Sequence, residues 1–245
     1  MYREVEEAAL VAWPGLRQVT LDGWQLRAAR GYTRRANSVQ ALGPSTRALA
    51  EKIQECERWY AAERLRCVFR ITPFSEPSLE DHLIGRGYVE EGRSQVMVRA
   101  LADDGAGEDA AELELTEWIA AYARLSGLAA PPDALDALVR AIPVQRVTMC
   151  VRGERGQVVS VGMGVLDGPA FGLFDLVTAT EARGRGHGSR LIAGLLGWAR
   201  TRGAAQAYLQ VLESNEGARR LYTRLGFRRA YDYWYRVRPE PPTLT

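Results

Sequence analysis

Short apolar runs and helix-spaced apolar positions follow one another along the whole chain, which predicts a protein of mixed strands and helices. In the first half, we expect strands at residues 24–29, 36–42, 66–72 and 92–99, with helices at 46–64 and 79–86. In the second half, we expect strands at 112–115, 146–151, 158–166, 171–177, 205–212 and 231–235, with helices at 116–126, 133–142 and 191–199 and a further helix that ends at Leu225.

A glycine-rich segment separates the strand at 171–177 from the helix at 191–199 and reads Arg183-Gly184-Arg185-Gly186-His187-Gly188. Glycine tolerates the positive φ angles that let several backbone N–H groups point outward together. The start of the following helix adds unpaired N–H groups and the positive end of the helix dipole. We therefore expect an anion site suited to a phosphate or pyrophosphate.

Two common glycine-loop motifs do not fit this segment. A Walker loop needs a Lys followed by Ser or Thr after its last glycine, but Ser189 and Arg190 follow Gly188. A dinucleotide-binding loop follows the first strand of its fold and has an acidic residue about 20 positions later. This loop lies in the last third of the chain, and Glu213 is too far along.

A second motif follows the next predicted strand, where residues 214–227 read SNEGARRLYTRLGF. The loop matches the pattern Arg-x-x-Gly-x-Gly, and the second segment supplies Asn, Ala, Leu-Tyr and Leu-Gly-Phe in order. Together they closely resemble the two signatures of the GNAT superfamily of acetyltransferases, over about residues 112 to 238. Gly226 is most simply the left-handed stop of the helix before Phe227.

The resemblance implies an α/β (α+β) fold with a mixed, mostly antiparallel twisted sheet flanked by helices. It also implies that acetyl-CoA is the acyl donor and that no metal is needed. By match to the family's motifs, the coenzyme A-binding residues are Leu176, Val177, Thr178, Arg183, Gly184, Arg185, Gly186, His187, Gly188, Ser189, Asn215, Ala218 and Tyr222.

Several of these residues also have simpler structural interpretations. Ser214 or Asn215 can cap the following helix, and Asn215 can both cap it and bind the pantetheine arm. Tyr222 lies on the apolar helix face with Ala218 and Leu225, so it packs in the core or, as in the family, directs its hydroxyl at the thioester sulfur. We expect His187 to face solvent or to contact phosphate.

The chemistry that the resemblance implies is direct acyl transfer from a thioester to an amine. Backbone N–H groups around residues 176–178 would stabilise the acyl oxygen, and Tyr222 would act as the general acid that protonates the departing thiolate. Some relatives have a Glu base at the position of Gln210, which cannot act as one. Asp175, within an apolar run, and Glu213 are the two candidates for the general base.

The chain divides at a small, acidic, glycine-bearing segment that reads as a linker. We expect an N-terminal domain at residues 1–101, a linker at 102–111 and a catalytic domain at 112–245. Residues 64–100 repeat the order of residues 204–238: strand, helix, Gly-aromatic, strand. The first half thus resembles a degenerate GNAT unit, joined in tandem to an intact one.

The degenerate unit lacks the parts that bind the donor. Gly43-Pro44-Ser45 stands where the phosphate loop would be, Glu76 stands in place of Asn215, and Leu83 stands in place of Tyr222. We therefore expect turnover only in the second unit. A non-catalytic sensor that binds acyl-CoA and contacts a partner is the alternative function.

Composition agrees with an ordinary enzyme. The resemblance leaves the identity of the amine acceptor open. A hydrophobic share of 47% is enough to build cores. The net charge of +2 argues against general nucleic-acid binding. The absence of a long apolar stretch and the acidic first residues favour a cytoplasmic protein without a membrane segment. We expect either a monomer or a homodimer. The spacing of His82, His187, Cys56, Cys67 and Cys150 supports neither zinc nor disulfides.

Overall fold

The computed structural model describes residues 2–43, 45–101, 110–128 and 133–239. The chain forms two compact units: a large unit of residues 1–12 and 96–230, and a small unit of residues 13–95 and 231–245. Neither unit is one stretch of chain, whereas the sequence predicts contiguous domains at 1–101 and 112–245. Most of the predicted linker, residues 102–109, lies outside the described residues.

The large unit contains a mixed sheet with strand order β5-β10-β9-β8-β7-β6. The ladders β6–β7, β7–β8 and β8–β9 are antiparallel, and β9–β10 is parallel. Its elements are α1 (Tyr2–Ala12), β6 (Ala111–Glu112), α4 (Leu115–Leu125), α5 (Asp133–Arg140), β7 (Gln145–Arg152), β8 (Val158–Asp167), β9 (Ala170–Thr178), η2 (Thr180–Ala182), α6 (His187–Arg200), β10 (Gln206–Leu212) and α7 (Glu216–Arg224), with the end of β5 (Val89–Ala100) and the start of β11 (Arg228–Val237).

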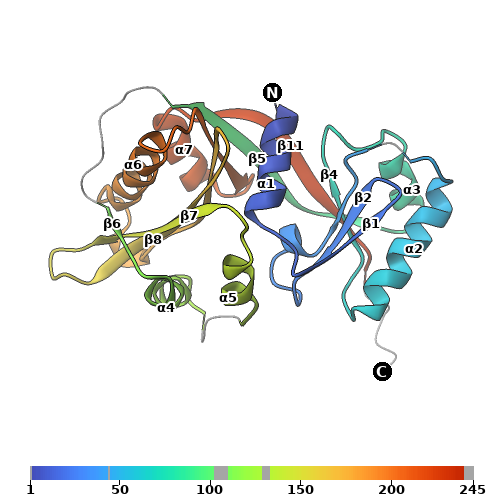
Figure 1. Cartoon of the computed structure of the whole chain (residues 1–245), viewed down its shortest axis with the longest axis horizontal. Coiled ribbons are helices and arrows are strands. Elements are labelled where there is room, and N and C mark those ends of the chain that lie inside the picture. Colours follow the sequence, from blue (N-terminus) through green and yellow to red (C-terminus); the bar gives the residue numbers. More distant parts are fainter. Residues whose placement is uncertain (1, 44, 102–109, 129–132, 240–245) are drawn as a thin grey trace. The chain divides into compact units, whose positions relative to one another are not determined.

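Helices cover both faces of this sheet, with α6 and α7 on one face and α4 and α5 on the other (Figure 1). The apolar stripe of α6, including Leu191 and Leu195, packs with Phe171 of β9 and Leu209 of β10 in one buried cluster. Burying such residues supplies most of the driving force for folding. The core therefore fixes α6, and with it the loop that precedes α6, against β9 and β10.

Strand β9 is irregular next to this loop. Val161 of β8 pairs with Val177 while Met163 pairs with Phe174, so β9 carries an extra residue opposite Gly162. Asp175 lies at this bulge with a φ of +49°, which is costly for a residue with a side chain. The parallel β9–β10 ladder is registered only from Ala170 to Leu173 of β9, although both strands continue beyond it.

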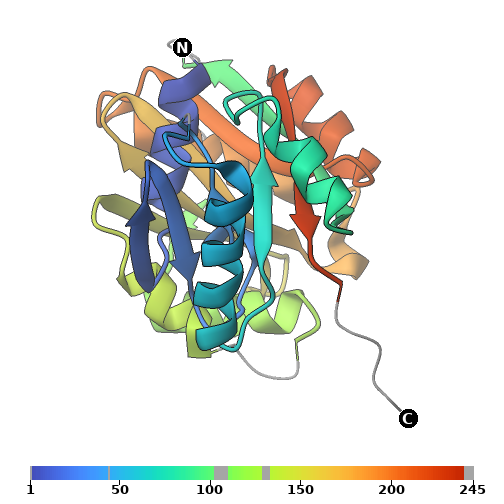
Figure 2. The same cartoon turned by 90° about the vertical axis from the view of Figure 1, so that its right-hand side faces the viewer.

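The small unit contains strands in the order β1-β2-β3-β4-β11. The β1–β2 and β2–β3 ladders are antiparallel, β3–β4 is parallel, and β4–β11 is antiparallel. Its elements are β1 (Arg17–Leu21), β2 (Trp24–Ala28), η1 (Arg34–Ala36), β3 (Val39–Gln40), α2 (Leu49–Ala62), β4 (Val68–Ile71) and α3 (Leu79–Gly85), with the start of β5 and the end of β11. Helices α2 and α3 lie in front of these strands in Figure 2.

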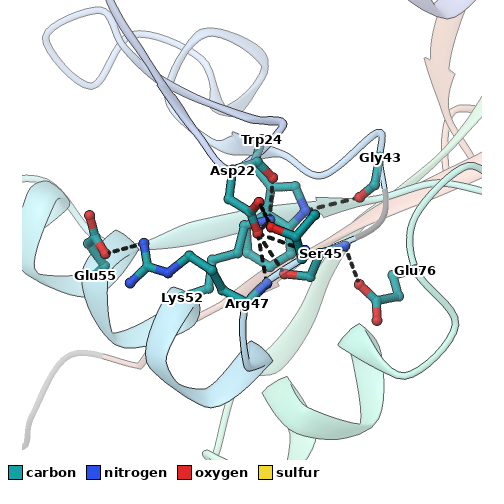
Figure 3. Close-up of polar contacts among 9 residues, drawn as sticks. Asp22, Trp24, Gly43, Ser45, Arg47, Lys52, Glu55 and Glu76 are labelled. Carbon is teal, nitrogen blue, oxygen red and sulfur yellow. Dashed lines mark hydrogen bonds and ion pairs between the residues drawn. The ribbon is translucent and has the colours of Figure 1, made fainter.

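An Asp-Gly hairpin turn organises the small unit. Asp22 and Gly23 join β1 to β2 with φ angles of +46° and +78°, the conformation that a two-residue turn of this type requires. The Asp22 carboxylate accepts hydrogen bonds from the backbone N–H groups of Thr46 (2.9 Å) and Arg47 (3.2 Å), just before α2. Figure 3 shows these contacts converging on Asp22.

The ammonium group of Lys52 completes this network. Its Nζ donates to the backbone oxygen of Asp22 (2.6 Å), lies 3.1 Å from Asp22 Oδ2 and sits 3.8 Å from the ring centre of Trp24. The Lys52 side chain is completely buried. Side-chain hydrogen bonds from Thr46 and Lys52, with the backbone N–H groups, hold the pKa of Asp22 well below its usual value.

The structure corrects several predicted elements. Helix α1 and strand β1 were not predicted, because the charged start of α1 hides a stripe of Val5, Ala8 and Ala12, and because the residues of β1 are mostly exposed without alternation. Strand β3 is shorter than the predicted 36–42. Helix α2 begins at Leu49 rather than Thr46 because residues 45–47 bond to Asp22 and Glu76.

Two runs of four strands, one in each unit, have the same connectivity. Strands β1 to β4 and β7 to β10 each form two antiparallel ladders and then a parallel one, with α2 and α6 as the crossover helices. A helix and a long strand then follow in both cases. The strand beside β4 is β11, however, and the strand beside β10 is β5, so β5 and β11 each begin in one unit and end in the other.

Candidate active site

A cavity of about 640 Å³ opens in the large unit beside the loop before α6. It is lined from β9, the loop, the start of α6 and α7. All of the predicted coenzyme A-binding residues except Arg185 line it, together with residues that were not predicted. The lining residues are Ser160, Leu176, Val177, Thr178, Ala182, Arg183, Gly184, Gly186, His187, Gly188, Ser189, Leu191, Ile192, Asn215, Gly217, Ala218, Leu221, Tyr222 and Arg224.

The loop has the conformation that an anion site requires. Gly184 and Gly186 have φ angles of +75° and +81°, and Gly186 is the residue before the first turn of α6. The N–H groups of a first helical turn have no partner within their helix, so here they are available at the cavity edge. A Cβ on Gly188 would lie 3.3 Å from a methyl group of Leu221, so this glycine keeps the cavity open.

His187, the first residue of α6, is buried and lines the cavity, so the solvent-facing alternative is wrong and contact with phosphate stays a prediction. Nη2 of Arg190 lies 2.6 Å from His187 Nδ1. A guanidinium can only donate, so Nδ1 accepts and the proton of the neutral ring is on Nε2. Burial, followed by the charges of Arg190 and Arg185, lowers the pKa of His187. The ring is therefore a neutral side chain of the cavity wall.

Asn215 caps α7 as predicted, and its binding of the pantetheine arm stays a prediction. It precedes α7, and its Oδ1 accepts a hydrogen bond from the Ala218 N–H (3.2 Å), so Asn215 rather than Ser214 caps the helix. It also lines the cavity. The cap fixes the first turn of α7 beside the loop, and this places the side of the helix that carries Ala218 and Tyr222 toward the cavity.

Tyr222 belongs to the buried core and also reaches the cavity. Its ring packs edge-on against Phe227 at 6.2 Å between ring centres, and only 9% of the residue is exposed. Burial raises the pKa of Tyr222 to about 12, so the phenol keeps its proton at neutral pH. Across the described residues, the Tyr222 hydroxyl has no hydrogen-bond partner, which leaves its proton free for a bound molecule.

The candidate bases lie less favourably. Asp175 is half-buried at the bulge of β9, between cavity-lining Leu176 and buried Phe174, but does not itself line the cavity. Glu213 is exposed, precedes α7 and does not line the cavity. Gln210 is half-buried on β10.

Ser160 is a cavity residue that the sequence reasoning missed. It is completely buried on β8, donates to the Val177 oxygen (3.0 Å) and shares a 2.8 Å hydrogen bond with the Thr178 hydroxyl. It therefore anchors the end of β9 at the cavity. A lone serine in the apolar run of β8 was the available signal. Arg224, on α7, was also missed and adds a positive charge to the wall.

Other chemistry has less support within the described part of the chain. No group of three or more His, Cys, Asp or Glu side chains there is placed to hold a metal ion. The thiols of Cys56, Cys67 and Cys150 are free and buried. None of the described helices combines the length and the apolar character needed to cross a bilayer.

The fold is that of a GCN5-related N-acetyltransferase. The solved structure of such a protein from Kribbella flavida is similar over 98% of this chain and 94% of its own, with a TM-score of 0.70 and 19% identity. The sequence profile described as "Probable histone acetyltransferase Rv0428c C-terminal" matches residues 1–236. The chain belongs to this family.

Two curated relatives extend over nearly the whole chain. The probable histone acetyltransferase Rv0428c of Mycobacterium tuberculosis is 31% identical over 241 residues, covering 92% of this chain and 70% of the relative. The uncharacterized N-acetyltransferase YobR of Bacillus subtilis is 26% identical over 245 residues, covering 96% of this chain and 98% of the relative.

Proposed function

We propose that this protein transfers an acetyl group from acetyl-CoA to a primary amine of a small molecule or protein. The observation that carries the proposal is the Tyr222 hydroxyl, which is protonated, without a partner in the described structure, and set in the wall of a cavity that also contains an anion-binding loop. Acetyl-CoA carries a thioester and a pyrophosphate at a distance from each other. Its site therefore needs a proton donor at the thioester and an anion-binding loop at the pyrophosphate.

The cavity suits the donor in shape and charge. The pyrophosphate would bind the N–H groups of the loop and first turn of α6, with Arg183 beside them. The amides of the pantetheine arm would lie between the parting strands β9 and β10, near Val177 and Asn215. A Cβ at Gly188 would press on Leu221 in the cavity wall, so a side chain there would narrow the space for the donor.

Acyl transfer would proceed without a covalent enzyme intermediate. The amine nitrogen attacks the thioester carbonyl, and backbone N–H groups around residues 176–178 stabilise the negative charge that grows on its oxygen. The carbon–sulfur bond then breaks, and Tyr222 donates its proton to the departing thiolate. The proton of the attacking amine leaves through Asp175 or water.

The alternative function is an acyl-CoA sensor that does not turn over. Gln210 favours it, because an amide replaces the carboxylate base found in some relatives, and because Asp175 does not line the cavity. Tyr222 favours the enzyme, since a sensor needs no proton donor at the sulfur end of its ligand.

Calorimetric titration with acetyl-CoA, followed by thiol release against a panel of amines, separates these functions. The enzyme is supported by binding together with amine-dependent release of thiol. Binding without release on any amine would leave the sensor. If the intact chain does not bind acetyl-CoA, both functions are excluded.

We further propose that the chain is a tandem of two GNAT-like repeats and that only the large unit binds the donor. The shared connectivity of β1–β4 and β7–β10 supports the duplication. Matching helix ends support it too, since the Tyr88 N–H donates to Leu83 and the Phe227 N–H donates to Tyr222, both at 3.0 Å.

The anion position of the small unit is filled by the chain itself. The N–H groups ahead of α2, which correspond to those ahead of α6, donate to the carboxylates of Asp22 and Glu76 (Figure 3). An internal carboxylate there stands where a phosphate would bind. This supports the expectation that the small unit has a structural role and does not turn over.

A further inference from the structure

A second cavity, of about 610 Å³, lies in the large unit on the other side of His187. His187 and Ala182 line both cavities, so the two spaces meet at the predicted pyrophosphate loop. The remaining walls come from the tip of the β7–β8 hairpin, the end of α4 and the start of α6. The lining residues are Arg124, Arg152, Gly153, Glu154, Arg155, Gln157, Val158, Val159, Glu181, Ala182, Arg185, His187 and Arg190.

The walls of this cavity are strongly basic. Five guanidinium groups face only two carboxylates, those of Glu154 and Glu181. Positive groups therefore outnumber negative ones in the cavity wall by three. A cluster of like charges is unfavourable without a counter-charge, so the cavity is suited to a multiply charged anion.

Backbone contacts hold two of these arginines in place without neutralising them. Arg152 donates to the Gly156 oxygen across the hairpin tip (3.0 Å), and Arg124 donates to the Val158 oxygen (2.9 Å). The hairpin itself is closed by the Gly153 N–H donating to the Gln157 oxygen (2.8 Å). These two charges are therefore positioned before any ligand arrives, which lowers the entropy cost of binding.

The position of the cavity indicates which part of a ligand it receives. It adjoins the loop that would hold the pyrophosphate, and neither Tyr222 nor Leu176, at the acyl end, lines it. An amine acceptor must reach the acyl end. The second cavity therefore faces the nucleotide end of the donor.

Building on the proposed function, we propose that this arginine-lined cavity binds the 3′-phosphate on the ribose of coenzyme A. A phosphate monoester carries nearly two negative charges at neutral pH and offers three acceptor oxygens, which planar guanidinium groups bind in pairs. Arg185, the predicted cofactor residue that does not line the first cavity, faces this phosphate. Arg152 and Arg155 of the hairpin close over it.

The test compares acetyl-CoA with acetyl-3′-dephospho-CoA by calorimetric titration of the intact chain. We expect the wild type to bind acetyl-CoA about tenfold more tightly or better, which corresponds to roughly 1.4 kcal/mol or more. In the double variant Arg152→Ala/Arg155→Ala this preference should fall to about twofold, while the affinity for acetyl-3′-dephospho-CoA should stay at the wild-type value. Arg140→Ala, an exposed arginine on α5 paired with Asp136, is the matched control and keeps the full preference.

Each outcome decides the inference. Equal affinity of the wild type for the two ligands would overturn the phosphate site and leave acetyl-CoA binding intact. A preference that survives in the double variant would place the phosphate elsewhere. If neither ligand binds, the proposed function itself fails, so the two failures are distinguishable. A preference that decreases with added salt supports the inference, because guanidinium–phosphate contacts are screened.

Discussion

The side chain of Arg190 donates to Nδ1 of His187 at 2.6 Å, one helical turn apart at the start of α6. A protonated imidazole could not accept this hydrogen bond. Protonation of His187 would therefore break this contact in the wall between the two cavities. The contact also gives the folded protein a preference for neutral His187, which can be measured as a dependence of stability on pH.

His187→Gln should reduce the loss of stability at mildly acidic pH. The folded-state pKa of His187 is lowered, so below about pH 6.5 the unfolded chain takes up a proton that the folded chain resists. The histidine therefore costs stability as the pH falls, and this cost is absent at pH 7.5. Urea unfolding at pH 5.5 and 7.5 should give a smaller difference for the variant than for the wild type.

His82→Gln is the control for this measurement. His82 is the other histidine of the chain and is exposed on α3. Its variant shows how far the difference between the two pH values depends on removing a histidine from an exposed position. An unchanged difference in His187→Gln would show that the folded state does not favour neutral His187.

Tyr222→Phe should abolish most turnover while preserving the fold and the donor affinity. General acid catalysis contributes about 10²- to 10⁴-fold, so we expect kcat to fall at least about 100-fold. The hydroxyl has no hydrogen-bond partner in the described structure, so the free energy of unfolding should change by less than about 1 kcal/mol. Thiol release and calorimetric titration with acetyl-CoA measure the two effects separately.

Tyr88→Phe provides the matched control for Tyr222. Its hydroxyl donates to Glu57 at 3.0 Å in the small unit, so its loss should lower stability by about 1 kcal/mol and leave turnover unchanged. Turnover of Tyr222→Phe at the wild-type rate would remove Tyr222 from the mechanism.

Two glycines of the loop should respond differently to alanine. Gly188→Ala places a methyl group 3.3 Å from Leu221 at the cavity wall, so acetyl-CoA affinity should fall about tenfold or more with a small change in stability. At Gly186 the new Cβ meets nothing within 4 Å, but φ is +81°. Gly186→Ala should therefore cost roughly 1–2 kcal/mol of stability. Calorimetric and urea titrations of both variants test this contrast, and equal effects on affinity and stability would contradict it.

The loop and the α7 signature could be predicted from sequence because both are local. Gly184 and Gly186 stand where the backbone has positive φ angles, which glycine itself indicates, and Asn215 caps a helix that starts at the next residue. A single apolar core then brings these two segments to one cavity. Periodicity also located the strands around them to within a few residues.

The rest depended on contacts between distant residues. Nothing near Arg152 indicates that Arg124 and Arg185 will share a cavity with it. Likewise, the pairing of β4 with β11 joins residues more than 150 positions apart, and local patterns carry no record of such a partner. Asp-Gly is typical of a hairpin turn, but no hairpin was predicted at Asp22-Gly23, and no local pattern indicates its bonds to Thr46 and Arg47.

Lys52→Ala should strongly destabilise the small unit. The ammonium group is completely buried between Asp22 and the ring of Trp24, and removing one partner of a buried ion pair costs about 3–5 kcal/mol. Arg47→Ala, which breaks the half-exposed pair with Glu55, should cost less than about 1 kcal/mol. Urea unfolding measures both, and similar losses would show that burial adds nothing to the Lys52 contact.

The acidity of Asp22 predicts the pH range of this contribution. Its pKa is lowered in the folded state, so the stabilisation is present above the unfolded value of 3.8 and is lost as the pH falls below it. In Asp22→Asn, unfolding between pH 3 and pH 5 should therefore depend less on pH than in the wild type. An equal dependence in both would place the titrating group elsewhere.

Lys52 is also the only lysine of the chain, so the folded protein should not be acetylated on a lysine by its own donor. Burial lowers the pKa of Lys52 and favours the reactive neutral amine, but the completely buried side chain cannot reach acetyl-CoA or acetic anhydride. Peptide mass spectrometry should find residue 52 unmodified in native protein and acetylated by acetic anhydride in urea. Arg220→Lys supplies a lysine at an exposed position of α7 that should react in both states. Modification of Lys52 in the native state as fast as that of Arg220→Lys would show that the small unit opens readily.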